Sequence, residues 1–175
     1  MARPDVALAE PVCLALVVEG RTHGWAVAGL LAPDGDVGRI WSLSRPLTYR
    51  ALDQLVAAGL VDRAGQVPGR GRARTVLTAT TRGRRQSRRW LDRPVAHLRD
   101  VRTELLVKLE LRRRAGLALR PLLEAQQASF APLVERLTAA EHDPSDLVAR
   151  WRRESALAVV RFLEGASSEL PADPP

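Results

Sequence analysis

The chain has 175 residues, enough for one compact domain or two small ones, and 46% of them are hydrophobic while only 4% are aromatic. Its single cysteine, Cys13, excludes a disulfide within the chain and a cysteine-based metal site. This cysteine lies in the apolar run 12–18, which predicts a small buried hydrophobe. The run is too short to span a bilayer and lacks the pattern of a secretory signal. We therefore expect a cytoplasmic protein with no membrane partner.

The net charge of +7 is concentrated in the first half of the chain. Residues 1–93 carry 15 arginines against 8 acidic residues, whereas residues 94–175 carry 12 basic and 12 acidic residues. No acidic residue lies between Arg63 and Leu91. Such a field attracts a polyanion, because guanidinium groups neutralise phosphates. A solvated charged face is the alternative, and the charge distribution alone leaves both open.

The first segment predicts two short helices joined by a tight turn. Pro11 fits the first turn of a buried helix that runs through Val18 and ends at Gly20. Thr22 is a suitable N-cap for a second helix from 23 to about 31, closed by the turn signal at 33–36. The stretch 37–41 that follows is compatible with an extended conformation.

A third helix and a hairpin come next. Ser42 or Ser44 can cap the helix, Pro46 fits its first turn, and Gly59 stands where a C-cap glycine belongs. A strand begins at 60–61, a loop covers 66–71, and a β-branched strand returns over 75–80. Three helices followed by a hairpin predict a winged helix-turn-helix with a two-stranded wing.

The rest of the chain is predicted to be helical, so the fold class is mainly α. Helices are expected over 80–91, 95–114, 117–137 and 143–163, the last capped by Asp143 or Ser145. We predict a DNA-binding domain over 1–93, a helical dimerisation domain over 94–167 and a disordered tail over 168–175.

The leading turns of the third helix carry groups that can contact base edges or phosphates in a major groove. These candidates are Ser44, Arg45, Thr48, Tyr49 and Arg50, with Leu47 expected to face inward. Arg45 and Arg50 can each form a bidentate contact to guanine. Two alternatives stay open: Arg50 can pair with Asp53, and Tyr49 can pack in the core with its hydroxyl at the edge.

The hairpin carries arginines at alternate positions, which project to the same side of an extended chain. These are Arg70, Arg72 and Arg74, predicted to grip the DNA backbone or the minor groove. A disordered basic loop is the alternative reading. The arginines between 82 and 89 lie on a helix and cannot all face DNA, so we expect some of them to serve solubility only.

The order of several short motifs resembles the PadR-like transcriptional regulators. They are Glu19-Gly20-Arg21-Thr22-His23-Gly24-Trp25, Ser44 through Leu52, Ala58-Gly59-Leu60-Val61 and Thr80-Thr81-Arg82-Gly83, with later likeness at 97–111 and 151–164. The resemblance covers nearly the whole chain. It implies a winged helix-turn-helix, dimerisation through C-terminal helices, and a repressor released by a small molecule or another signal. Trp25 replaces the family's usual tyrosine, and Leu77 stands where a tyrosine is usual in the second wing strand.

The predicted winged helix-turn-helix also indicates the partners of the protein. One winged helix reads few base pairs, so we expect a homodimer on double-stranded DNA with an inverted-repeat operator. His23 is a candidate DNA contact, and its alternative role is to satisfy backbone groups at a helix start. A small-molecule effector is possible, with Trp25, Trp90 and Trp151 as candidate pocket residues and Trp41 also considered; large aromatics of this kind more often form core.

We expect no enzyme, no metal and no cofactor, because no catalytic constellation, phosphate-binding loop or metal-ligand spacing stands out. The remaining rival is a helical protein-interaction module without sequence-specific DNA binding. That module would not require all of its excess positive charge in the first half.

Overall fold

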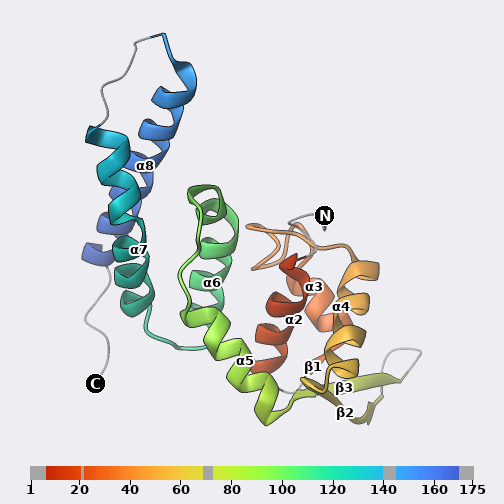
Figure 1. The fold of residues 1–175 in the computed structure, drawn as a ribbon. Helices are drawn as coiled ribbons and strands as arrows, with labels where there is room; N and C mark the ends of the chain where they lie inside the picture. The colour runs from red at the N-terminus through yellow and green to blue at the C-terminus, as the bar shows by residue number, and fades with distance from the viewer. Residues whose placement is uncertain (1–6, 21, 69–72, 140–144, 170–175) are drawn as a thin grey trace. The chain divides into compact units, whose positions relative to one another are not determined.

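The computed structural model describes residues 7–20, 22–68, 73–139 and 145–169 (Figure 1). Its contacts divide the chain into two compact units. Unit 1 comprises 1–91 and 106–116, and unit 2 comprises 92–105 and 117–175. The stretch 106–116 thus packs with the N-terminal segments, although it lies beyond the boundary expected at residue 93.

Three helices form the centre of unit 1: α2 (Ala9–Val18), α3 (Gly24–Leu30) and α4 (Arg45–Ala57). Seven of the ten residues of α2 are buried, so this helix is apolar on nearly every side and serves as the core against which α4 packs. Helix α4 begins after Ser44, with Pro46 in its first turn. It ends before Gly59, whose φ of +66° is a conformation that glycine adopts at little cost.

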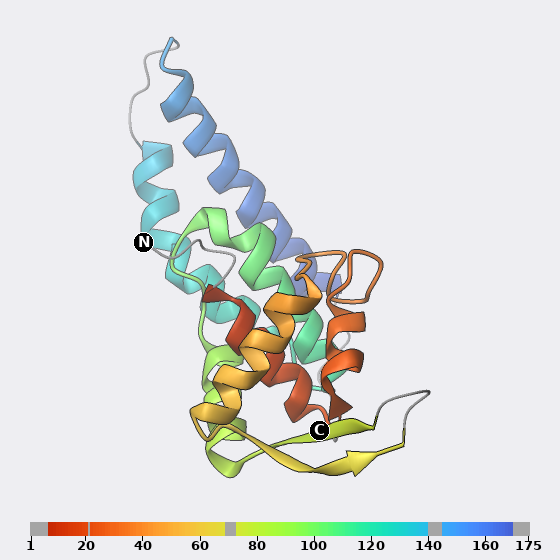
Figure 2. The same ribbon diagram turned by 90° about the vertical axis from the view of Figure 1, so that its right-hand side faces the viewer.

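A three-stranded antiparallel sheet, in the order β1-β3-β2, completes unit 1. Strands β2 (Val61–Val67) and β3 (Arg74–Ala79) form the hairpin, which projects beyond the helices of unit 1 (Figures 1 and 2). The register shifts between Arg63 and Gln66, where Gly65 has a φ of +121°. The three helices and the hairpin confirm the predicted winged helix-turn-helix.

Strand β1 (Thr22–His23) corrects the prediction for the start of the second helix. Thr22 pairs with Leu77 in the sheet instead of capping α3. The N-cap is His23, whose Nδ1 accepts a hydrogen bond from the Ala26 N–H at 3.0 Å. Pairing with β3 is a long-range contact that the local sequence did not signal, and it adds a third strand to the two-stranded wing.

Two helices brace this arrangement within unit 1: α5 (Thr81–Asp92) and α6 (Leu106–Arg114). Thr80 Oγ1 accepts from the Gly83 N–H at 3.0 Å and so caps the start of α5. Gly83 itself lies against the backbone carbonyl of Leu60, so a Cβ at this position would overlap with backbone that cannot move away. The start of α5 is therefore fixed against the end of α4.

A network of charges attaches α6 to the other elements of unit 1. Arg114 donates through Nε and Nη2 to both carboxylate oxygens of Glu19, at 3.0 and 2.9 Å, and through Nη1 to Asp36 at 2.6 Å. Glu110 accepts from Arg113 at 2.7 and 3.1 Å, and this hydrogen bond is the main cause of the lowered pKa of Glu110. Arg39 reaches the same carboxylate at 3.4 Å. Bidentate pairs of this kind fix geometry as well as charge.

Unit 2 is built mainly from α7 (Arg120–Ala139) and α8 (Leu147–Glu169), which pack on each other. The short helices η1 (Leu98–Asp100) and η2 (Val101–Leu105) belong to the same unit. Gln126 is fully buried and bonds the backbone of Val95 in both directions, donating to the carbonyl and accepting from the N–H. In α8 only Ala156 and Leu163 are buried.

Several predicted bounds differ from the observed ones. The stretch 37–41 forms turns instead of an extended segment: the Val37 carbonyl accepts from the N–H groups of Ile40 and Trp41, at 3.0 and 3.1 Å, and the side chains of Val37 and Trp41 are buried. The helix expected from Val95 starts at 98 and passes through η1 and η2 before α6. Helix α8 is capped by Asp146 and continues to 169, into the tail expected to be disordered from 168; the residues from 170 onward lie outside the described part of the chain.

Within the described ranges, no helix combines the length and the apolar character that crossing a bilayer requires.

Candidate nucleic-acid interface

The leading turns of α4 are open to solvent. Ser44, Arg45, Tyr49 and Arg50 are all exposed, and Ser44 occupies the N-cap position without a capping hydrogen bond from its side chain. Exposed donors on the first turns of a helix can reach base edges and phosphate oxygens. Four of the five candidates on this helix thus share one accessible surface.

Thr48 is a correction to the predicted set. It is fully buried, and its Oγ1 donates to the Ser44 carbonyl at 3.0 Å, so it has no surface with which to touch DNA. The buried stripe of α4 runs through Thr48, Ala51, Leu52 and Leu55, at steps of three and four. Thr48 takes the first position of this stripe, and Leu47, expected to face inward, is 38% exposed.

The alternative role considered for Arg50 was an ion pair with Asp53, but Asp53 pairs with another arginine. Its Oδ1 accepts from Arg63 Nη2 at 2.7 Å, which links α4 to the wing strand β2. Sequence reasoning missed Arg63, since no local pattern relates it to a carboxylate ten residues earlier on a different element. The ion pair is largely exposed, so it contributes little to stability.

Of the three hairpin arginines, Arg74 is the one that the structure describes; Arg70 and Arg72 lie outside the described residues. Arg74 begins β3 and is half-buried. Its guanidinium carbon lies 4.8 Å from the centre of the Trp25 ring, and its Nη1 lies 3.4 Å from His23 Nε2.

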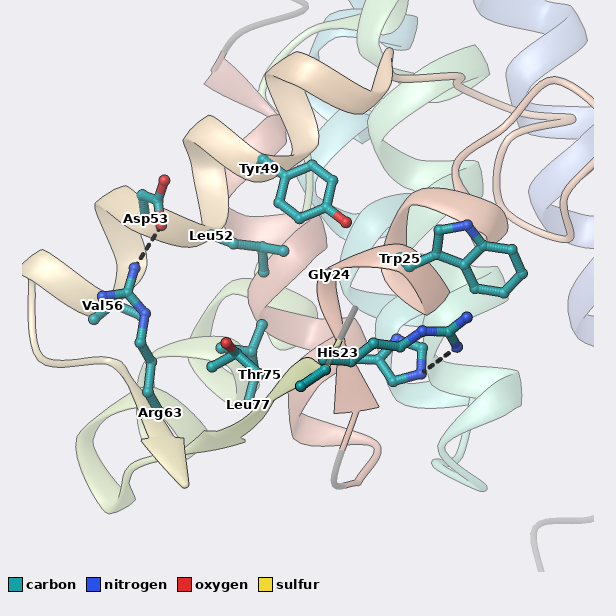
Figure 3. Close-up of a pocket in the computed structure, with 12 residues that line it drawn as sticks. His23, Gly24, Trp25, Tyr49, Leu52, Asp53, Val56, Arg63, Thr75 and Leu77 are labelled. Atoms are coloured by element: carbon teal, nitrogen blue, oxygen red, sulfur yellow. Dashed lines mark hydrogen bonds and ion pairs between the residues drawn. The ribbon is translucent and has the colours of Figure 1, made fainter. Parts of the chain in front are cut away.

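These side chains surround a cleft of about 500 Å³ between α4 and the wing (Figure 3). Tyr49 and Leu52 face Thr75 and Leu77 across it, while the Asp53–Arg63 pair lies toward one end and His23 and Trp25 toward the other. Two of the candidates, Tyr49 of α4 and Arg74 of β3, therefore line the same cleft, although more than twenty residues separate them in the chain.

Gly24 explains how Tyr49 enters this cleft. A Cβ built on Gly24 would lie 2.6 Å from Tyr49 Cε1. The ring therefore packs against the start of α3 while 46% of the residue stays exposed. Packing and availability for contact, the two roles weighed for Tyr49, are both compatible with this position.

The tryptophans fall into different surroundings. Trp25 is 52% exposed on the cleft, and Trp41 is buried in the core of unit 1. Trp90 is half-buried, with the ammonium of the fully buried Lys108 5.1 Å from its ring centre. Trp151, in unit 2, is 73% exposed. A shared effector pocket for Trp25, Trp90 and Trp151 stays a prediction.

In the described part of the chain, no three histidine, cysteine or acidic side chains gather in a way that would hold a metal ion. Cys13 is buried in α2, and this burial raises the pKa of its thiol to about 12. The thiol is thus an apolar packing group at neutral pH.

Comparison with known proteins gives a structural match. No protein-family model and no curated protein matches the chain. A crystal structure of Bacillus subtilis PadR in complex with operator DNA has a TM-score of 0.47 and 19% identity, over 90% of this chain and 97% of that chain. A second structure of Bacillus subtilis PadR has a TM-score of 0.45 and 18% identity, over 96% and 97%. The chain is similar to PadR along nearly its whole length.

Proposed function

We propose that this protein is a PadR-like, sequence-specific transcriptional regulator without enzymatic activity, acting on double-stranded DNA in the cytoplasm. The observation that carries the proposal is the surface formed by the first turns of α4 and the adjoining cleft. Arg45, Tyr49 and Arg50 are exposed there, and Arg74 of the wing lines the same cleft. In this arrangement α4 enters the major groove while the wing contacts the backbone beside it.

Charge supports the same conclusion. The excess of positive charge lies within residues 1–93, which include α4 and the whole hairpin. Neutralisation of phosphates provides the sequence-independent part of the affinity, and the exposed arginines of α4 provide the selection among sequences.

Specificity further requires two reading helices, and α8 offers a surface for pairing. Leu147, Trp151, Ser155, Ala158 and Phe162 follow one another at steps of three and four, so they lie along one face of the helix. Leu147, Trp151 and Phe162 are exposed large hydrophobic residues. We propose that a homodimer covers this face and that its two α4 helices read the two halves of an inverted repeat, which lie about 34 Å apart on DNA.

We further propose that the dimer acts as a repressor and that a small-molecule effector releases it. Titration of the intrinsic tryptophan fluorescence with phenolic acids and cationic drugs tests the effector. No response across a broad panel would remove the effector from the proposal and leave the DNA binding intact.

The test of DNA binding is selection from a random duplex library by the purified protein, followed by gel retardation with excess competitor DNA. We expect recovery of a two-fold symmetric motif that resists competition. The rival helical interaction module would use the α8 face but has no need for exposed arginines on α4. Recovery of no motif, with equal retardation of all duplexes, would favour that rival.

A further inference from the structure

Nitrogen atoms of His23 and Arg74 lie close together at the His23 end of the cleft. His23 Nε2 and Arg74 Nη1 are 3.4 Å apart, and both residues line the cleft. The two come from β1 and β3, which are neighbouring strands, and His23 pairs with Val76 in their register. The sheet therefore fixes their separation.

The backbone determines which nitrogen of His23 carries the proton. Nδ1 accepts the hydrogen bond from the Ala26 N–H, and so it must present a lone pair. In the neutral ring the proton then resides on Nε2. Arg74 is always a donor, so the contact between Nε2–H and Nη1 joins two donors and leaves both without an acceptor in each other.

Trp25 holds the guanidinium in this position. Arg74 lies over the indole ring at 4.8 Å, within the range of a cation–π contact. Among the described residues that line the cleft, the only carboxylate is Asp53, which is paired with Arg63. No carboxylate among these residues is left to accept from the two donors, so a negatively charged acceptor for them would be supplied by a bound molecule.

We propose that His23 Nε2–H and the Arg74 guanidinium donate to the same non-bridging oxygen of one DNA backbone phosphate, with Trp25 as the positioning residue for Arg74. A phosphate oxygen has the lone pairs and the charge to accept from both groups. This inference rests on the proposed function, and it assigns one phosphate to one pair of side chains. The contact fixes the register of the protein on the duplex and carries no sequence information.

The test separates the two roles of His23. In His23→Asn the side-chain oxygen can still cap α3, because asparagine is a good N-cap, but the distant Nε2–H donor is lost. In His23→Ala both are lost. We expect thermal stability to be retained in His23→Asn and reduced in His23→Ala, while both variants bind DNA about fivefold to tenfold more weakly.

The phosphate is located with methylphosphonate linkages, which remove the charge from one phosphate at a time. Duplexes containing the selected motif are modified singly, and their affinities are measured by fluorescence anisotropy. We expect one position in each half-site of the symmetric motif whose modification weakens the wild type more than it weakens His23→Asn or Arg74→Ala. Equal penalties in the wild type and in these variants at every position would overturn the proposal.

Two further variants complete this series. Trp25→Leu should weaken binding at the same phosphate and leave the penalties at other phosphates unchanged, since it acts through Arg74. Arg136→Ala removes an exposed arginine of α7 in unit 2 and should match the wild type at every position. A uniform loss in Trp25→Leu at all positions would contradict its positioning role.

Nitrogen NMR of His23 provides a readout independent of affinity. The free protein at neutral pH should show the proton on Nε2, and DNA should shift that resonance. A proton on Nδ1 would overturn the proposal, as would a response to inorganic phosphate without a response to DNA. If the wild-type protein binds no duplex at all, the proposed function itself is wrong. If it binds DNA and neither His23→Asn nor any methylphosphonate changes the affinity, only this inference is wrong.

Discussion

Helices α4 and α8 both expose one face, but the two faces differ in chemistry. The first turns of α4 present arginines, a serine hydroxyl and a tyrosine, whereas α8 presents Leu147, Val148, Trp151 and Phe162. A charged face is stable in water and gains from a polyanion, while an apolar face gains from contact with another apolar surface. This difference is consistent with the proposal that DNA is the partner of the first face and a second protein surface the partner of the second.

The two helices also differ in how much of their surface packs against other elements of their own unit. Helix α4 is packed against α2 and α3 and buries four residues of its own. Helix α8 is ten residues longer but buries only Ala156 and Leu163. Unit 1 thus contains its own core, whereas unit 2 leaves apolar surface that a second copy of the chain can cover.

The largest expected effect is on the α8 face. Trp151→Glu places a charge in the middle of the stripe and should raise the dimer dissociation constant by at least about 30-fold, because a tryptophan hot spot contributes about 2 kcal/mol or more. Size-exclusion chromatography with light scattering over a concentration series measures it. Arg153→Ala, on α8 but off the stripe, is the control. A wild type that is monomeric at micromolar concentration would contradict the proposal that the apolar face of α8 is a dimer interface.

On the α4 face, Arg45→Ala and Arg50→Ala should reduce discrimination between the selected motif and random DNA by about 1–3 kcal/mol for each arginine that reads a base. Gel shifts at several salt concentrations separate this from a general loss of affinity. Equal losses on specific and random duplexes would make these arginines phosphate contacts and not base readers.

Substitutions of two glycines test how closely neighbouring segments pack at the two ends of α4. Gly83→Ala should lower the free energy of unfolding by about 1–2 kcal/mol, because its methyl group meets the Leu60 backbone carbonyl. Gly24→Ala meets a ring atom of the half-exposed Tyr49, which can swing aside, and it should change stability less. Urea unfolding of both variants checks the order, and the reverse order would contradict it.

A smaller effect is expected where α6 joins unit 1. The hydrogen bond from Arg113 is the main cause of the lowered pKa of Glu110 in the folded protein. The Glu110 carboxylate therefore stabilises the fold fully above pH 4.5, the pKa of the unfolded state, and this stabilisation is lost as the pH falls through the lower pKa of the folded state. Glu110→Gln should be about 1 kcal/mol less stable at pH 7. The difference should shrink on acidification below pH 4.5.

Urea unfolding at a series of pH values measures this dependence. Glu124→Gln, which changes an exposed carboxylate of α7, is the control. A difference between Glu110→Gln and the wild type that does not vary with pH would show that the ion pair is not its source.

Much of the candidate site could be predicted because it depends on local signals. Pro46 and Gly59 define the ends of α4, and polar residues on its first turns identify an exposed surface. Thr48 was assigned wrongly, although its spacing to Ala51, Leu52 and Leu55 already marks it as part of the buried stripe. A short polar residue can satisfy its hydroxyl within its own helix, so residue type alone did not reveal its burial.

By itself, the amino-acid sequence determined the helices, the hairpin and the uneven charge, because periodicity, caps and composition act over a few residues. Only the tertiary structure decided that β1 pairs with β3, that His23 caps α3 and lies beside Arg74, and that 106–116 belongs to unit 1. These features join residues that are distant in the chain. Their formation depends on sheet pairing and buried packing, which no local window of sequence contains.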